Sequence, residues 1–121
     1  MEYEYNDIAL AILDFLKDGE YHSIMATVLE VGKYLHLSQN EMKEISKSRD
    51  SKKPLFTNTK IYVQTVLVVS HFRKAKFIKD FPKTSKLGFF SITDKGLDVS
   101  NMKKNEIKAK INSELAKYSK K

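Results

Sequence analysis

The 121-residue chain has no cysteine, only four glycines, and no apolar run of the roughly eighteen residues that a membrane span requires. The lack of cysteine excludes disulfide frameworks, thiolate zinc sites and cysteine nucleophiles. None of the glycines forms a phosphate-cradling loop. The start of the chain, Met1-Glu2-Tyr3-Glu4, lacks the basic and apolar stretches of a secretory signal. We therefore expect one cytoplasmic domain with no membrane partner.

Positive charge is in excess and is carried almost entirely by lysine. Lys and Arg number 22 against 15 Asp and Glu, for a net charge of +7, and Arg49 and Arg73 are the only arginines. The excess lies in residues 47–86 and after residue 103. This balance is typical of proteins that bind nucleic acids or anionic membranes. Because Arg is the usual bidentate reader of guanine, a lysine surface favours phosphate contacts, although lysine is also chosen for solubility.

Apolar residues spaced by three and four predict helices in the first half of the chain. The first runs from about Ile8 to Leu16, with Asn6 or Asp7 as its cap and Asp18-Gly19 as its stop. A second opens at His22 or Ser23 and carries one buried stripe.

A third, short helix follows over about residues 39–46. Ser38 and Glu41 have the spacing of a capping box, in which each residue's side chain bonds the other's backbone N–H.

The run from Asn58 to Ala75 contains no Gly or Pro and predicts a fourth, mostly buried helix, with Thr57, Asn58 and Thr59 as sources of a cap. Its β-branched residues lower helix propensity, so a buried strand over residues 61–69 is the alternative.

A narrow polar stripe marks this fourth helix on a helical wheel. It consists of Lys60, Gln64, His71 and Lys74. Lysines suit phosphates, whereas Gln and His suit base edges, so the stripe is a candidate groove-facing surface. The alternative is that it is merely the solvated side of a core helix.

Alternating apolar residues then predict a β-hairpin over residues 77–92, with Lys83, Ser85 and Lys86 in its turn. A short helix capped by Thr93 follows it. The fold class that this order predicts is mainly α with a small β-hairpin, a winged helix-turn-helix over residues 1–99. Residues 100–121 form a basic amphipathic helix or tail.

Several phrases of the sequence match one known pattern in order and spacing. They are Leu35-His36-Leu37-Ser38 for L-x-L-S, Ser51 with Pro54-Leu55-Phe56-Thr57-Asn58 for S-G-x-x-P-x-F-x-N, Phe72-Arg73-Lys74-Ala75-Lys76-Phe77-Ile78 for L-x-K-A-G-L-I, and Gly88-Phe89-Phe90-Ser91-Ile92-Thr93-Asp94-Lys95-Gly96 for G-x-Y-x-I-T-x-x-G. With these phrases, residues 7–99 resemble the N-terminal domain of Mrr-type restriction proteins, a winged-helix family.

The resemblance implies recognition of double-stranded DNA within a restriction system, beside a nuclease domain on another or a longer chain. Residues of the nuclease type, Glu41-Met42-Lys43 and Glu106-Ile107-Lys108, fall on predicted helices rather than on a sheet. The three histidines lie on separate elements without metal-ligand spacing. We expect no enzyme activity, no metal and no cofactor.

The first functional hypothesis is therefore a non-catalytic DNA-binding module. Its candidate DNA contacts are Lys52, Lys53, Asn58, Thr59, Lys60, Gln64, His71, Lys74, Lys83, Ser85 and Lys86. The alternative is a protein-interaction or assembly domain, because fold does not fix function. A DNA binder clusters its lysines on one face, whereas an adaptor presents a contiguous apolar patch.

The tail has its own apolar stripe: Ile107, Ile111, Leu115 and Tyr118 share one face of a predicted helix over residues 104–118. So short a basic helix needs something to cover this face. We expect a homodimer through it; packing against Ile8 and Ile12 of the same chain is the alternative.

Overall fold

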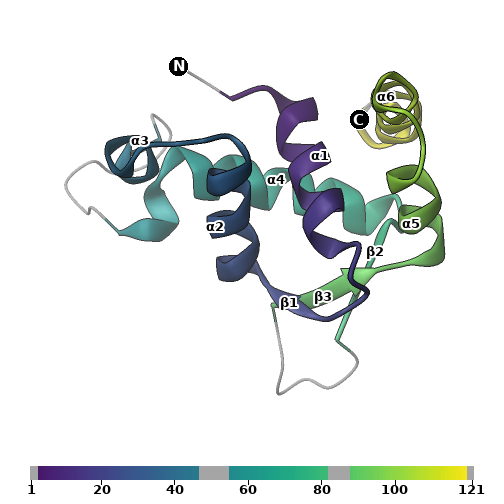
Figure 1. The fold of residues 1–121 in the computed structure, drawn as a ribbon, viewed down its shortest axis with the longest axis horizontal. Coiled ribbons are helices and arrows are strands. Elements are labelled where there is room, and N and C mark those ends of the chain that lie inside the picture. Colours follow the sequence, from purple (N-terminus) through teal and green to yellow (C-terminus); the bar gives the residue numbers. More distant parts are fainter. Residues whose placement is uncertain (1–2, 47–54, 82–87, 120–121) are drawn as a thin grey trace.

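The computed structural model describes residues 3–46, 55–81 and 88–119 as a mainly helical fold with a small antiparallel sheet of three strands (Figure 1). The predicted helical character is confirmed. In chain order the elements are α1 (Tyr5–Leu16), β1 (His22–Ser23), α2 (Ile24–Tyr34), α3 (Gln39–Lys43), the 3-10 turn η1 (Phe56–Asn58), α4 (Lys60–Lys74), β2 (Ile78–Asp80), β3 (Phe89–Ile92), α5 (Asp94–Ser100) and α6 (Lys104–Ser119).

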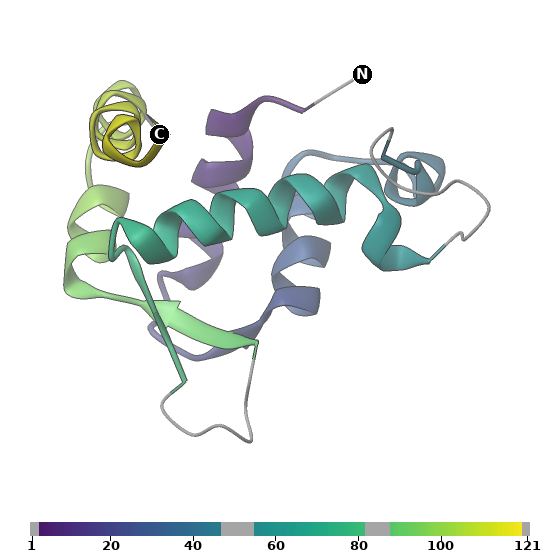
Figure 2. The same cartoon turned by 180° about the vertical axis from the view of Figure 1, so that it is seen from behind.

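Helix α4 is the central element of the fold. It contacts α1, α2, α3, α6, β2 and η1, and Figure 2 shows it crossing in front of α1 and α2. Ile61, Val68 and Phe72 on its inner side are almost completely buried. Burying each such side chain contributes about 1.5–3 kcal/mol. The helix prediction for this run is confirmed, because packing outweighs the low helix propensity of its β-branched residues.

Caps set the starts of α2 and α3 as the sequence predicts. The hydroxyl of Ser23 accepts from the backbone N–H of Ala26 at 3.1 Å. Ser38 accepts from Glu41 N–H at 3.1 Å and donates its own N–H to the Glu41 carboxylate at 2.8 Å, so the capping box is confirmed.

Two predicted helix limits differ from the structure. Helix α1 already begins at Tyr5 after Glu4, so neither Asn6 nor Asp7 is its cap. Helix α3 ends at Lys43, short of residue 46, because the chain leaves it to pair Ile45 with Thr59 in an antiparallel bridge.

Helices α2 and α4 each end in a hydrogen-bonded turn of the same type. After α4 the N–H of Phe77 bonds the Phe72 carbonyl at 2.9 Å, the N–H of Lys76 bonds the Arg73 carbonyl at 3.2 Å, and Lys76 has φ of +65°. His36 takes the equivalent place after α2, with φ of 57°. These are Schellman turns, in which the residue with positive φ is usually Gly.

The predicted hairpin is confirmed in its strands: β2 pairs with β3, with Ile78 opposite Ile92. Strand β1 was not predicted; it pairs His22 with Phe90 on the other side of β3 and gives the sheet order β1-β3-β2. A strand of two residues is too short to show a period-two pattern. Thr93 caps α5 as predicted, accepting from Gly96 N–H at 3.1 Å.

The predicted tail helix is present as α6, and two residues of its predicted apolar stripe are buried within the chain. Ile107 and Ile111 are 6% and 0% exposed and belong to the same core as α1. The buried carboxylate of Glu114 also accepts from Lys95 of α5 at 2.8 Å. Ile107 and Ile111 follow the intramolecular alternative, since α6 packs against α1, α4 and α5. The homodimer through residues 104–118 stays a prediction.

Substituting Lys76→Gly is expected to stabilise the fold. A residue with a side chain costs roughly 1–2 kcal/mol in the left-handed conformation, and Lys76→Gly removes this cost. The greater flexibility of Gly in the unfolded chain offsets roughly 0.5–1 kcal/mol of the resulting gain in stability. The free energy of unfolding, measured by urea denaturation, should rise by about 0.5–1 kcal/mol. Lys74→Gly, in the last turn of the same helix, is the matched control and should lower it. Equal losses from both substitutions would contradict this explanation.

Candidate nucleic-acid interface

Lys60, the first residue of the predicted polar stripe, lies inside the protein. Its side chain is only 4% exposed, and its ammonium is 3.2 Å from the Glu44 carboxylate of α3. The backbone N–H of Lys60 also donates to the Glu44 carbonyl at 2.8 Å. Lys60 was predicted to meet DNA, but its charge is buried and paired with Glu44 rather than offered to solvent.

Gln64, one turn further along α4, is paired with the N-terminal segment. Its side-chain amide donates to the Tyr3 carbonyl at 3.2 Å, and its amide oxygen accepts from the Tyr3 N–H at 3.2 Å. The two bonds hold the chain before α1 against the polar edge of α4, which we define as Lys60, Gln64 and His71.

His71, two turns further along α4, is held by Tyr5. The hydroxyl of Tyr5 lies 2.8 Å from Nδ1 of His71, and the two rings are 5.8 Å apart. Burial raises the pKa of the Tyr5 hydroxyl well above its usual value, so it stays protonated at neutral pH. Burial, and then the charge of Lys74, lower the pKa of His71, so a neutral imidazole is favoured.

The side of α4 that faces solvent is displaced from the polar stripe. Leu67 is 50% exposed, and Val63 and Val66 are half-buried beside it. Lys74 is the one member of the predicted stripe that is exposed. The outward face of α4, defined as Val63, Val66, Leu67, Ser70 and Lys74, is thus apolar at its centre and basic at its C-terminal end.

A cluster of exposed cations continues from this basic end into β2. Lys74, Lys76 and Lys79 form no ion pair within the described parts of the chain, whereas Arg73 binds the Asp80 carboxylate at 2.9 Å and 3.0 Å. We call Lys74, Lys76 and Lys79 the basic cluster. Of these three lysines, only Lys74 was among the predicted DNA contacts; the run of cations between residues 73 and 79 is the signal that would have pointed to Lys76 and Lys79.

The other candidate DNA contacts divide into two groups. Asn58 and Thr59 belong to the start of α4: Thr59 is buried and accepts from Tyr62 N–H at 3.4 Å as the helix cap, and the Asn58 carbonyl accepts from Ser46 at 2.9 Å. Thr59 is thereby corrected from a DNA contact to a structural cap. The remaining candidates, Lys52, Lys53, Lys83, Ser85 and Lys86, lie outside the described residues.

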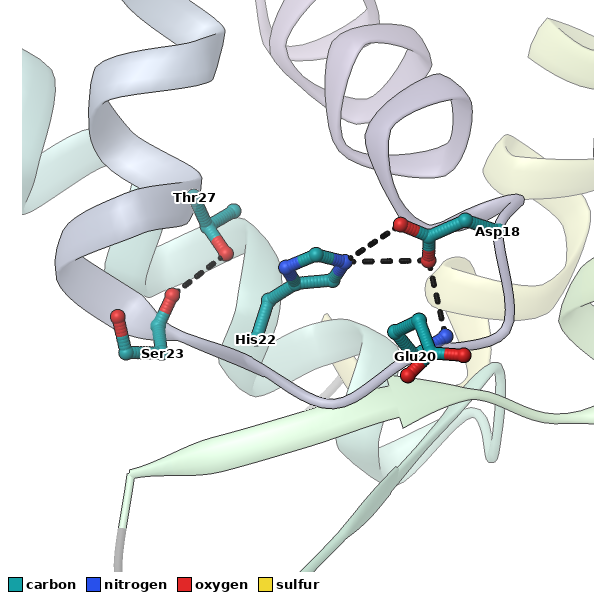
Figure 3. Close-up of polar contacts among 5 residues, drawn as sticks. All are labelled: Asp18, Glu20, His22, Ser23 and Thr27. Atoms are coloured by element: carbon teal, nitrogen blue, oxygen red, sulfur yellow. Dashed lines mark hydrogen bonds and ion pairs between the residues drawn. The ribbon is translucent and has the colours of Figure 1, made fainter.

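A second polar group lies in the turn between α1 and α2 (Figure 3). His22 Nε2 is 2.9 Å and 3.1 Å from the Asp18 carboxylate oxygens. The backbone N–H of Glu20 and then His22 hold the pKa of Asp18 below its usual value. In Figure 3 the Ser23 hydroxyl points away from the imidazole, in agreement with its use as the α2 cap. The geometry closes a turn and aligns no nucleophile with a base.

No group of three or more His, Asp or Glu side chains in the described ranges is placed to hold a metal ion. No helix of the described part is long and apolar enough to cross a membrane. Comparisons of the chain with protein-family models, curated proteins and solved structures found no match.

The Tyr5–His71 contact predicts how stability depends on pH. Because the folded state lowers the pKa of His71, the unfolded chain takes up the proton first as the pH falls through about 6.5. The free energy of unfolding should therefore decrease between about pH 7.5 and pH 5.5. His71→Asn removes the titrating group, so urea denaturation at both pH values should show a smaller decrease. The same decrease in both proteins would contradict the assignment to His71.

Proposed function

We propose that the chain is a non-catalytic, DNA-binding winged-helix module, similar to the N-terminal domain of Mrr-type restriction proteins. The order of elements supports this proposal: a helix, a short strand, further helices ending in α4, and then a hairpin whose strand β3 lies between β1 and β2. In such a fold the last helix before the hairpin and the hairpin turn are the parts offered to DNA. Here these parts are α4 and residues 81–88.

The basic cluster is the observation that carries the proposal. Lys74, Lys76 and Lys79 are exposed and close to one another in the chain. The sequence between β2 and β3 also contains Lys83 and Lys86, which lie outside the described residues. Lysines contact phosphates as point charges and release the counterions condensed on DNA. A surface of this kind supports binding that is driven by charge and weakened by salt.

The proposed role includes no chemical step, and the protein is proposed to act in the cytoplasm. Cleavage in a restriction system would be the task of a nuclease domain on another or a longer chain. The proposal therefore assigns double-stranded DNA as the ligand of this chain, with the nuclease as a protein partner.

A protein-interaction domain is the second candidate, and one observation favours it. Leu67 is 50% exposed at the centre of the outward face of α4, and Leu55, before η1, is 58% exposed. Exposed apolar residues that form a patch are typical of an interface between proteins, and Leu67 with the half-buried Val63 and Val66 supplies such a patch on α4. The two candidates therefore differ in whether the apolar centre of α4 or its basic C-terminal end carries the binding.

Replacing lysines of the basic cluster should weaken DNA binding and reduce its dependence on salt. Each lost phosphate contact removes about 0.9 from the slope of log affinity against log salt on B-DNA. The double variant Lys74→Ala/Lys79→Ala should therefore lose up to about 1.8 of this slope, measured by fluorescence anisotropy with a labelled duplex.

The matched control is Lys17→Ala/Lys33→Ala, which removes the same charge from exposed positions at the end of α1 and on α2. It should leave the slope near that of the unaltered protein. Equal effects of the two double variants would place binding elsewhere. No binding to duplex DNA at about 50 mM salt would contradict the DNA-binding proposal and favour the protein-interaction candidate.

A further inference from the structure

The side-chain amide of Gln64 is occupied by the chain itself. A Gln recognises adenine by presenting its amide oxygen and its amide N–H together to one base edge. In this protein both of these atoms are bonded to the backbone of Tyr3, each at 3.2 Å. The pair of atoms that would recognise a base is the pair that holds the N-terminal segment.

The other polar groups along this edge of α4 are also engaged. Nδ1 of His71 is bonded to the Tyr5 hydroxyl, and the ammonium of Lys60 is bonded to Glu44. Gln64 and His71 are seven positions apart, which places them on the same side of the helix two turns apart. Residues 3–5, which we call the N-terminal cover, therefore hold both side chains.

The N-terminal cover is anchored in the core. Tyr5 is the first residue of α1, and Ile8 and Ala9 in the next turn are completely buried. Tyr3 and Tyr5 themselves pack against the core residues. Uncovering Gln64 would require Tyr3 to leave its place on the core, and uncovering His71 would require the Tyr5 side chain, in the first turn of α1, to do the same.

The outward face of α4 offers few groups that distinguish bases. The apolar side chains of this face, those of Val63, Val66 and Leu67, have no hydrogen-bonding atoms. The hydroxyl of Ser70 can hydrogen-bond to either kind of base pair and so does not distinguish between them. Lys74 at the end of the helix suits a phosphate. What α4 presents to a duplex is thus apolar contact and charge.

We propose that the N-terminal cover keeps the polar edge of α4 away from DNA, so that this protein binds duplex DNA through phosphates with little discrimination between base sequences. This inference rests on the proposed DNA-binding function. The ligand class it names is double-stranded DNA of any sequence.

The experiment is selection of bound molecules from a randomised duplex pool at low salt, followed by sequencing, for the intact protein and for Gln64→Ala. Any base at any position should be enriched less than about fivefold, which is the discrimination of the weakest bidentate base contact. Gln64→Ala should bind the pool with unchanged affinity and salt dependence. Its Tm should fall by several degrees, because it loses both bonds to Tyr3.

Gln39→Ala is the matched control, since Gln39 is exposed at the start of α3 and forms no hydrogen bond with the N-terminal cover in the described structure. It should change neither DNA binding nor Tm appreciably. A sequence motif enriched by the intact protein and lost in Gln64→Ala would overturn the inference while leaving DNA binding established. Failure of the intact protein to retain any duplex would overturn the proposed function and the inference with it.

Discussion

The burial of α4 is the constraint on which the rest of the structure depends. This helix packs against α1, α2, α3, α6, β2 and η1, and its inner side chains, among them Ile61, Val68 and Phe72, are almost fully buried. Burying an unpaired polar group costs free energy, so partners are favoured for the polar side chains of a helix enclosed so widely. Glu44 therefore pairs with Lys60, and the N-terminal cover meets Gln64 and His71. The hydroxyl of Thr65, buried on the same helix, is an exception, because it has no hydrogen-bond partner among the described residues. What α4 leaves exposed is an apolar centre and a basic end.

The features that sequence analysis predicted correctly are local ones. The capping box of Ser38 and Glu41, the cap at Ser23 and the hairpin strands each depend on residues a few positions apart. Their geometry follows from short-range hydrogen bonding and side-chain alternation, which a sequence displays directly. The positive φ of Lys76 is a local feature too, but the sequence does not display it, because Lys stands at the position of a Schellman turn that Gly usually occupies.

The features that were missed depend on which distant element covers a given side chain. A helical wheel identified the polar stripe of α4, but nothing in its spacing indicates that Tyr3 and Tyr5 lie against Gln64 and His71, more than sixty positions later. The same limit applies to Ile111, whose stripe suits a second chain as well as the core that buries it. The candidate site moves as a result from the middle of α4 to its C-terminal end.

The measurement that tests this account most directly is NMR chemical-shift mapping of the intact protein during titration with duplex DNA. The account predicts the largest changes at the backbone amides of residues 73–81, together with unchanged signals from the Gln64 side-chain amide and the Tyr3 backbone amide. Large changes at Gln64 and His71, with little change at Lys74 and Lys79, would contradict it, because they would show that DNA reaches the polar edge of α4 and that the N-terminal cover gives way.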